Sequence, residues 1–163
     1  LSQKPLFQLF PEGRWISRKY LLGHSPRYVV PDKTIIVAKQ GTLGEDELFC
    51  RCELITGKRA LERAYTDHCM RIVVRPNEIE AGYLFAFLRS NAGFRILRSL
   101  AEGSKQQDLH WKRVPNIPIP RLTSEAEKEV AEMVYRAYDD RNAAIELITE
   151  ATREVESKIR MGV

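Results

Sequence analysis

The sequence predicts an α+β protein: a mixed, irregular β-sheet with packed helices, followed by a long C-terminal helix of the coiled-coil type. Short apolar runs bounded by Gly, Pro or Asn are typical of strands and occur in the first half of the chain. A helical period follows over residues 80–100. From residue 124 onward no Gly or Pro occurs until Gly162, which predicts one uninterrupted helix.

The clearest strand candidate is residues 34–38, because TIIVA is a continuous apolar run rich in β-branched residues. The sequence QGTLG follows directly, and its two glycines permit a tight turn. Further strands are expected at residues 47–54 and 70–74. The last of these is followed by Pro76, which favours a stop.

The apolar spacing of residues 80–100 favours one or two packed helices, with a break near residues 91–93. A polar loop follows, and then three prolines occur within residues 115–120. Proline excludes a regular helix there and favours an extended path. On such a path Ile117 and Ile119 point the same way, which predicts that both pack against the domain.

The long helix is expected to begin at Ser124, which has the capping-box spacing to Glu127. About 37 residues at about 1.5 Å each give a length of about 55 Å, more than the width of a small domain. Its apolar residues recur at spacings of three and four, interrupted by Arg141, and predict close packing against another long helix. These helix-packing residues are Val130, Val134, Ala137, Ala144, Ile148, Ala151 and Val155.

The net charge of +4 is unevenly distributed along the chain. Residues 1–122 hold twenty of the 26 basic residues but only twelve of the 22 acidic ones. A positive field of this kind favours a polyanionic partner such as nucleic acid. No apolar run reaches 18 residues, so no membrane partner is expected. Three cysteines make no disulfide framework and predict a reducing, cytoplasmic setting.

The order of these elements resembles the target-recognition domain of a specificity subunit from a type I restriction-modification system. The segments that carry the resemblance are TIIVAKQGTLGE (34–45), YLFAFLRSNAGFRIL (83–97), EGSKQQDLHWKRVPNIPIP (102–120) and SEAEKEVAEMV (124–134). The resemblance implies a DNA target-recognition domain over residues 1–122 and a spacer or dimerisation helix over residues 123–163.

The resemblance also implies partners. These are double-stranded DNA, the methyltransferase (modification) and restriction subunits, and a second recognition domain that binds the other half of a split target. The segments that carry the resemblance correspond to one recognition domain and one long helix. We therefore expect either half of a two-domain subunit or a half-length subunit that pairs with a second copy through its helix.

Candidate DNA contacts fall into three groups of polar and basic residues. Gln can pair bidentately with adenine, and Lys can bind guanine or phosphate. Each group has an alternative interpretation: an ordinary solvated surface, or in the first case a simple glycine hairpin. Trp111, within the third group, is expected to pack in the core. The candidates are Lys39, Gln40 and Thr42; Lys58, Arg59 and Arg63; and Ser104, Lys105, Gln106, Gln107, His110 and Lys112.

No catalytic motif, cofactor or metal site is predicted. Cys50, Cys52, His68 and Cys69 lack the paired Cys-x-x-Cys spacing of zinc sites, so buried, reduced cysteines are expected. Asp32 and Lys39 could belong to a metal-dependent nuclease, but such a site would need a carboxylate ligand two residues before the lysine. Val37 stands at that position, so a nuclease is not expected. Neither a nucleophile elbow nor an Asn-Pro-Pro-aromatic methyltransferase motif occurs. The alternative function is a non-catalytic protein-interaction module that assembles through its long helix.

Overall fold

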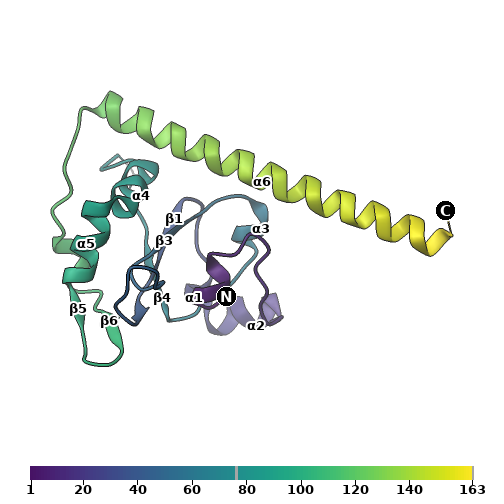
Figure 1. Cartoon of the computed structure of the whole chain (residues 1–163), viewed down its shortest axis with the longest axis horizontal. Helices are drawn as coiled ribbons and strands as arrows, with labels where there is room; N and C mark the ends of the chain where they lie inside the picture. The colour runs from purple at the N-terminus through teal and green to yellow at the C-terminus, as the bar shows by residue number, and fades with distance from the viewer. Residues whose placement is uncertain (76, 163) are drawn as a thin grey trace.

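The structure, a computed structural model, describes residues 1–75 and 77–162, apart from the side chain of Arg59. Residues 1–122, here called the head, are α+β, and the long helix α6 (Ser124–Met161) crosses one side of the head (Figure 1). The C-terminal part of α6 extends beyond the head. The predicted fold class, with its long C-terminal helix, is confirmed.

The first sheet is antiparallel, with strand order β3-β1-β4. The central strand β1 (Thr34–Ala38) has the bounds expected from TIIVA, and all its residues are buried. It pairs with β3 (Cys52–Ile55) on one side and β4 (Cys69–Ile72) on the other. Because side chains alternate along a strand, Ile35 and Val37 face one hydrophobic core while Ile36 faces a second.

The strand expected over residues 47–54 begins only at Cys52, and the expectation was wrong for the residues before it. There the chain turns: Glu47 N donates to Gly44 O at 3.1 Å, and Arg51 N to Leu48 O at 2.8 Å. Cys50 has a φ of 66°, which is incompatible with a strand. This conformation lets Cys50 N donate to Ala38 O at 2.8 Å and so close the end of β1.

The second sheet is also antiparallel and has the order β2-β6-β5. Its strands are β2 (Gln40–Gly41), β5 (Ala101–Glu102) and β6 (Gln107–Leu109). Gly103 begins the tight β5–β6 loop with a φ of 115°, and a Cβ there would lie 2.3 Å from Gln106 O. Only glycine fits this loop, which projects on the side of the head away from α6 (Figure 1).

The helical region predicted over residues 80–100 as one or two helices is two, and the break lies at Ser90, just before the expected residues 91–93. Ser90 has extended backbone angles, and its hydroxyl accepts a hydrogen bond from Gly93 N at 3.2 Å, which caps the second helix. The helices are α4 (Ala81–Arg89) and α5 (Asn91–Ser99). The shorter helical elements are α1 (Gln3–Leu6), α2 (Arg18–His24), η1 (Pro26–Tyr28), α3 (Lys58–Leu61) and η2 (Val114–Asn116).

The proline-rich segment is extended from Ile117 onward, after the short turn η2. Ile117 is buried, and Ile119 packs against the same core, so both point inward as predicted. The hydroxyl of Tyr83 in α4 donates to Pro120 O at 2.5 Å. The segment therefore lies along the head and leads to the start of α6.

The cap of α6 is Thr123 and not Ser124, so the predicted capping box of Ser124 and Glu127 does not form. The hydroxyl of Thr123 accepts from Ala126 N at 3.3 Å. Glu127 is buried, accepts two hydrogen bonds from the Arg121 guanidinium at 2.7 and 2.9 Å, and accepts a third from Leu122 N at 3.0 Å. The bond to Arg121 lowers the pKa of Glu127 below its ordinary value.

Helices α4 and α6 touch at Gly82 and Ala131. A Cβ on Gly82 would lie 2.8 Å from both the Cα and the carbonyl oxygen of Ala131, closer than real Cβ contacts occur. The Gly82 N–H also donates to the hydroxyl of Tyr135 at 3.0 Å. The absence of a side chain at residue 82 therefore allows α6 to approach the head.

We expect Gly82→Ala to lower the free energy of unfolding by about 1–3 kcal/mol, because the obstructing atoms are backbone and cannot rotate away. Gly23→Ala is the matched control, since Gly23 lies in α2 with open space at its Cβ position. That control should stabilise the protein by about 0.5–1 kcal/mol. Urea denaturation measures both, and equal effects of the two variants would contradict the close approach.

Glu127→Gln should destabilise the protein at neutral pH but not in acid. A carboxyl group whose pKa is lowered by folding contributes stability above its unfolded value, and this is lost as the pH falls through the folded value. The difference in unfolding free energy between variant and wild type should therefore shrink below about pH 4.5. Glu125→Gln, an exposed first-turn control, should show a smaller difference. A Glu127→Gln difference that stays constant from pH 7 to pH 3 would refute this.

Candidate nucleic-acid interface

Two of the three predicted contact groups lie at opposite ends of β1. Thr34 pairs with Ile55 in the antiparallel register, so Lys58 follows β3 at the start of β1. Lys39 follows the last residue of β1. A five-residue strand is about 17 Å long. The basic groups around Lys39 and Lys58 therefore do not form one continuous surface along this strand.

The second sheet instead brings the first and third groups together. Gln40 pairs with Asp108, and Gly41 pairs with Gln107. The N–H of Leu109 donates to Lys39 O at 2.8 Å. This pairing places two predicted groups, far apart in sequence, on one surface. We call it the hairpin face; its candidate residues are Lys39, Gln40, Thr42, Ser104, Lys105 and Gln106.

His68 also lies at the hairpin face, although it is not among the DNA contacts predicted from the sequence. Lys39 N donates to His68 O at 3.1 Å. The Nδ1 atom of His68 contacts Gln40 Oε1. His68 immediately precedes β4, and only the register of β4 against β1 places it beside Gln40. No spacing in the sequence signals this contact.

The face continues from His68 to the turn η1 through Asp67. The hydroxyl of Tyr28 donates to Asp67 Oδ2 at 2.7 Å, and the Arg27 guanidinium approaches the same oxygen at 3.4 Å. The hydrogen bond from Tyr28, together with the charge of Arg27, lowers the pKa of Asp67. Asp67 is therefore ionised at neutral pH, and the positive charge of Arg27 partly offsets its negative charge.

The β5–β6 loop divides its predicted contacts into exposed and buried residues. Ser104, Lys105 and Gln106 are exposed. Gln107 is only 7% exposed, and its Nε2 donates to Gly103 O at 2.9 Å and to Ser104 O at 3.2 Å. Its amide therefore shapes the loop from inside, and the structure does not present it for contact with a ligand.

Trp111 was expected in the core, and this expectation was wrong: the residue is 64% exposed. A turn in which Arg113 N donates to His110 O at 3.0 Å carries it outward. Its ring lies 6.0 Å from that of His110, and the Lys112 ammonium lies 5.7 Å from the indole. Trp111 also borders an apolar cleft of about 360 Å³ between β4, α4 and the proline-rich segment.

Two arginines hold the chain that follows Thr42. The guanidinium of Arg98 in α5 donates to Gly44 O, and that of Arg51 donates to Glu45 O, each at 2.5 Å. Both guanidinium groups also lie over the ring of Phe94, at 4.3 and 4.2 Å from its centroid. These contacts tie the loop after β2 to α5 and fix the edge of the hairpin face.

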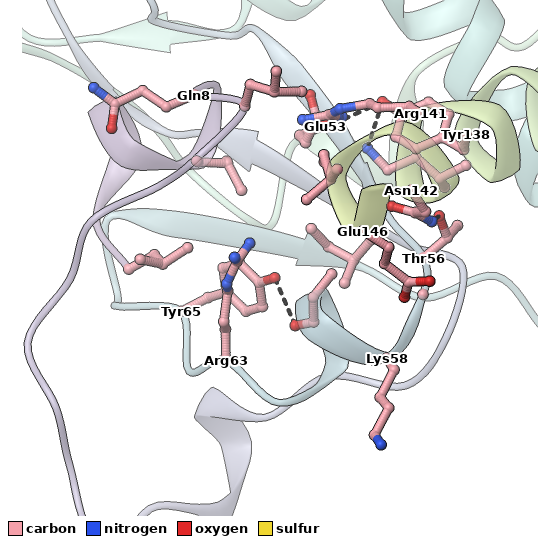
Figure 2. Close-up of a pocket in the computed structure, with 18 residues that line it drawn as sticks. Gln8, Glu53, Thr56, Lys58, Arg63, Tyr65, Tyr138, Arg141, Asn142 and Glu146 are labelled. Atoms are coloured by element: carbon pink, nitrogen blue, oxygen red, sulfur yellow. Dashed lines mark hydrogen bonds and ion pairs between the residues drawn. The ribbon is translucent and has the colours of Figure 1, made fainter. Parts of the chain in front are cut away.

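The remaining predicted group lies where the head meets α6. Lys58 and Arg63 border a cavity of about 70 Å³ lined by β3, the α3 region and α6. Figure 2 shows Lys58 pointing away from the other labelled side chains of this cavity. The side chain of Arg59 lies outside the described part of the chain. This group is therefore separate from the hairpin face and belongs to the junction with the helix.

At this junction a buried carboxylate binds the long helix. Glu53 in β3 is 7% exposed and accepts hydrogen bonds from the Tyr138 hydroxyl, at 2.9 Å, and from the Arg141 guanidinium (Figure 2). Burial, together with the charge of Glu53, raises the pKa of Tyr138. Burial alone would lower the pKa of Arg141, but the charge and hydrogen bond of Glu53 raise it. Arg141, which interrupts the apolar stripe in the sequence, is thus the partner of Glu53.

The predicted stripe of α6 lies beside the surface that contacts the head. Val130 and Val134 are partly buried, and Val134 packs against the main core. The residues that face the head also include Ala131, Tyr135 and Tyr138. The rest of the stripe is exposed in this chain: Ala137, Ala144, Ile148, Ala151 and Val155.

The cysteines are buried, as predicted. Burial raises the pKa of Cys50 and of Cys52 to about 12, so both thiols stay protonated at neutral pH and are poor nucleophiles or metal ligands. Over residues 1–75 and 77–162, His, Cys, Asp and Glu side chains form no group of three suited to hold a metal ion. In the same residues, no helix combines the length and apolar character needed to cross a membrane.

Comparison with known proteins identifies no family for this chain. No protein-family model matches its sequence, and no curated protein matches it. The hairpin face and the stripe of α6 therefore carry the functional interpretation.

Proposed function

We propose that this chain binds double-stranded DNA sequence-specifically, as the specificity subunit, or half of one, in a type I restriction-modification complex. It directs methylation and restriction by partner subunits and performs no catalysis of its own. The observation that carries the proposal is the hairpin face, where the second sheet joins two predicted contact groups. The excess of basic residues in residues 1–122 and the resemblance in element order support it.

The shape of the hairpin face suits a DNA groove. A two-stranded β-ribbon fits the major groove, and the narrow β5–β6 hairpin projects from the head (Figure 1). Lys39 and Lys105 supply positive charge for phosphates, while the amides of Gln40 and Gln106 supply donors and acceptors for base edges. Trp111, which lies beside His110 and Lys112, adds an exposed aromatic side chain.

The long helix supplies the second part of the function. Its exposed stripe consists of small and medium apolar residues, which allow two helices to approach closely. A second copy, or the second half of a parent subunit, would pack its own long helix against this stripe. Two heads at fixed spacing would then bind the two halves of one split target.

A protein-interaction module remains the second candidate, and one observation favours it. The segment before α2 exposes large apolar side chains, among them Phe10, Trp15 and Ile16. Exposed apolar groups of this kind are typical of protein contacts. The separation of Lys58 from the hairpin face also reduces the extent of a continuous basic surface. The next experiment distinguishes the two functions.

We expect the chain to bind duplex DNA with an affinity that falls steeply as salt is added. Lys39→Ala and Lys105→Ala should each weaken binding and reduce the slope of log affinity against log salt by about 1, because each removes a phosphate contact. Lys58→Ala is the matched control at the other end of β1 and should leave the slope unchanged. Fluorescence anisotropy measures all three. Absence of salt-sensitive binding, or an equal effect of the control, would contradict the proposal.

Pairing through α6 should depend on the exposed stripe. Ile148→Glu and Val155→Glu place a charge in the proposed helix contact and should shift the chain from dimer to monomer in sedimentation velocity. Leu147→Glu is the control, since Leu147 is also apolar and exposed but lies about 100° away around the helix from Ile148. Loss of the dimer in the control alone would place the contact on another side of α6.

A further inference from the structure

The contact between Gln40 and His68 is held by the backbone on both sides. Lys39 stands between the two sheets: its N–H donates to His68 O at 3.1 Å, and its carbonyl accepts from Leu109 N at 2.8 Å. Gln40 is fixed by its pairing with Asp108 in β6. The two side chains therefore meet because the two sheets meet, and neither depends on a flexible loop for its place.

The chemistry of the contact assigns the protons. An amide oxygen only accepts, so the contact between Gln40 Oε1 and His68 Nδ1 requires the proton on Nδ1. Gln40 then keeps two N–H donors on its amide nitrogen. Neutral His68 keeps an acceptor on Nε2, whereas protonated His68 has a donor there. The pair thus presents a donor beside an acceptor when His68 is neutral, and two donors when His68 is protonated.

These two patterns match the two purines in the major groove. Adenine offers the N7 acceptor beside the N6 amino donor, while guanine offers two acceptors, N7 and O6. A donor from Gln40 with an acceptor from neutral His68 complements adenine. Two donors complement guanine. His68 is exposed and Gln40 partly exposed, so both can reach a base edge.

Resting on the proposed DNA binding, we propose that Gln40 and His68 form one specificity-determining unit that recognises a single purine. Its preference changes from adenine to guanine when His68 becomes protonated. The charged and titratable groups around the unit come from η1, from the residue after β1, from β4 and the turn before it, and from β6. They are Arg27, Tyr28, Lys39, Asp67, Arg71 and Asp108.

Selection of binding sites from a randomised duplex library, with the full chain at pH 8 and at pH 5.5, tests the inference. Histidine side chains change charge within this interval. We expect one purine position whose adenine-to-guanine ratio falls by about tenfold or more from pH 8 to pH 5.5. Gln40→Ala should remove the preference at that position alone. His68→Asn should remove its pH dependence, while His24→Asn, an exposed histidine in α2 away from the hairpin face, should retain it.

Gln40→Glu supplies a second variant of nearly the same shape. It replaces the amide donors with acceptors and should move the preference at that position toward cytosine, whose N4 amino group donates. Circular dichroism melting shows whether each variant is folded. Failure of the wild-type chain to bind any duplex would contradict the proposed function itself. Binding with a motif that Gln40→Ala leaves unchanged, or a pH shift that survives His68→Asn, overturns this inference alone.

Discussion

The buried carboxylate of Glu53 is the constraint on which the arrangement of the molecule depends. A charge removed from water is tolerated only with hydrogen-bonded partners, and both side-chain partners here, Tyr138 and Arg141, come from α6. The helix must therefore cross the edge of the first sheet at this register. A second fixed point, Gly82 against Ala131, lies about 15 Å earlier along α6. Two points define a line, so head and helix are held in one orientation.

These two contacts with α6 give the head a side that faces the helix and a side that faces away from it. The junction side carries α4, β3 and the cavity beneath α6, and the β5–β6 hairpin lies on the side away from the helix (Figure 1). Lys39 connects the junction side to the hairpin side. It follows the buried strand β1, and its backbone is hydrogen-bonded to His68, before β4, and to Leu109 in β6. The hairpin face is thus joined to the end of the core strand by backbone hydrogen bonds at Lys39.

The elements that could be predicted are those whose signal is local. TIIVA predicted the bounds of β1, residues 91–93 predicted a helix break one residue after its actual place at Ser90, and the prolines predicted the extended segment, because each signal depends on a few consecutive residues. The turn before Cys52 could not be predicted, because it depends on the left-handed conformation that Cys50 adopts to meet the end of β1.

The candidate site could be predicted only in its parts. The polar groups at residues 39–42 and 104–112 were identified, but their union depends on pairing between β2 and β6, which composition does not encode. Burial also changed two assignments: Gln107 lies inside the loop, and Trp111 lies outside the core. Arg141 appeared as an interruption of an apolar stripe, and only the position of Glu53 in three dimensions explains it.

The undocked end of α6 has a consequence for how the helix forms. Past Ile145, which borders the junction cavity, most side chains of the helix are exposed, so that end gains little from packing. Starting a helix is costly, whereas extending one is cheap, and the docked turns provide the start. Local opening should therefore become easier toward Met161, and amide hydrogens should exchange faster along the same direction. A partner that packs there would extend the cooperative unit and slow that exchange.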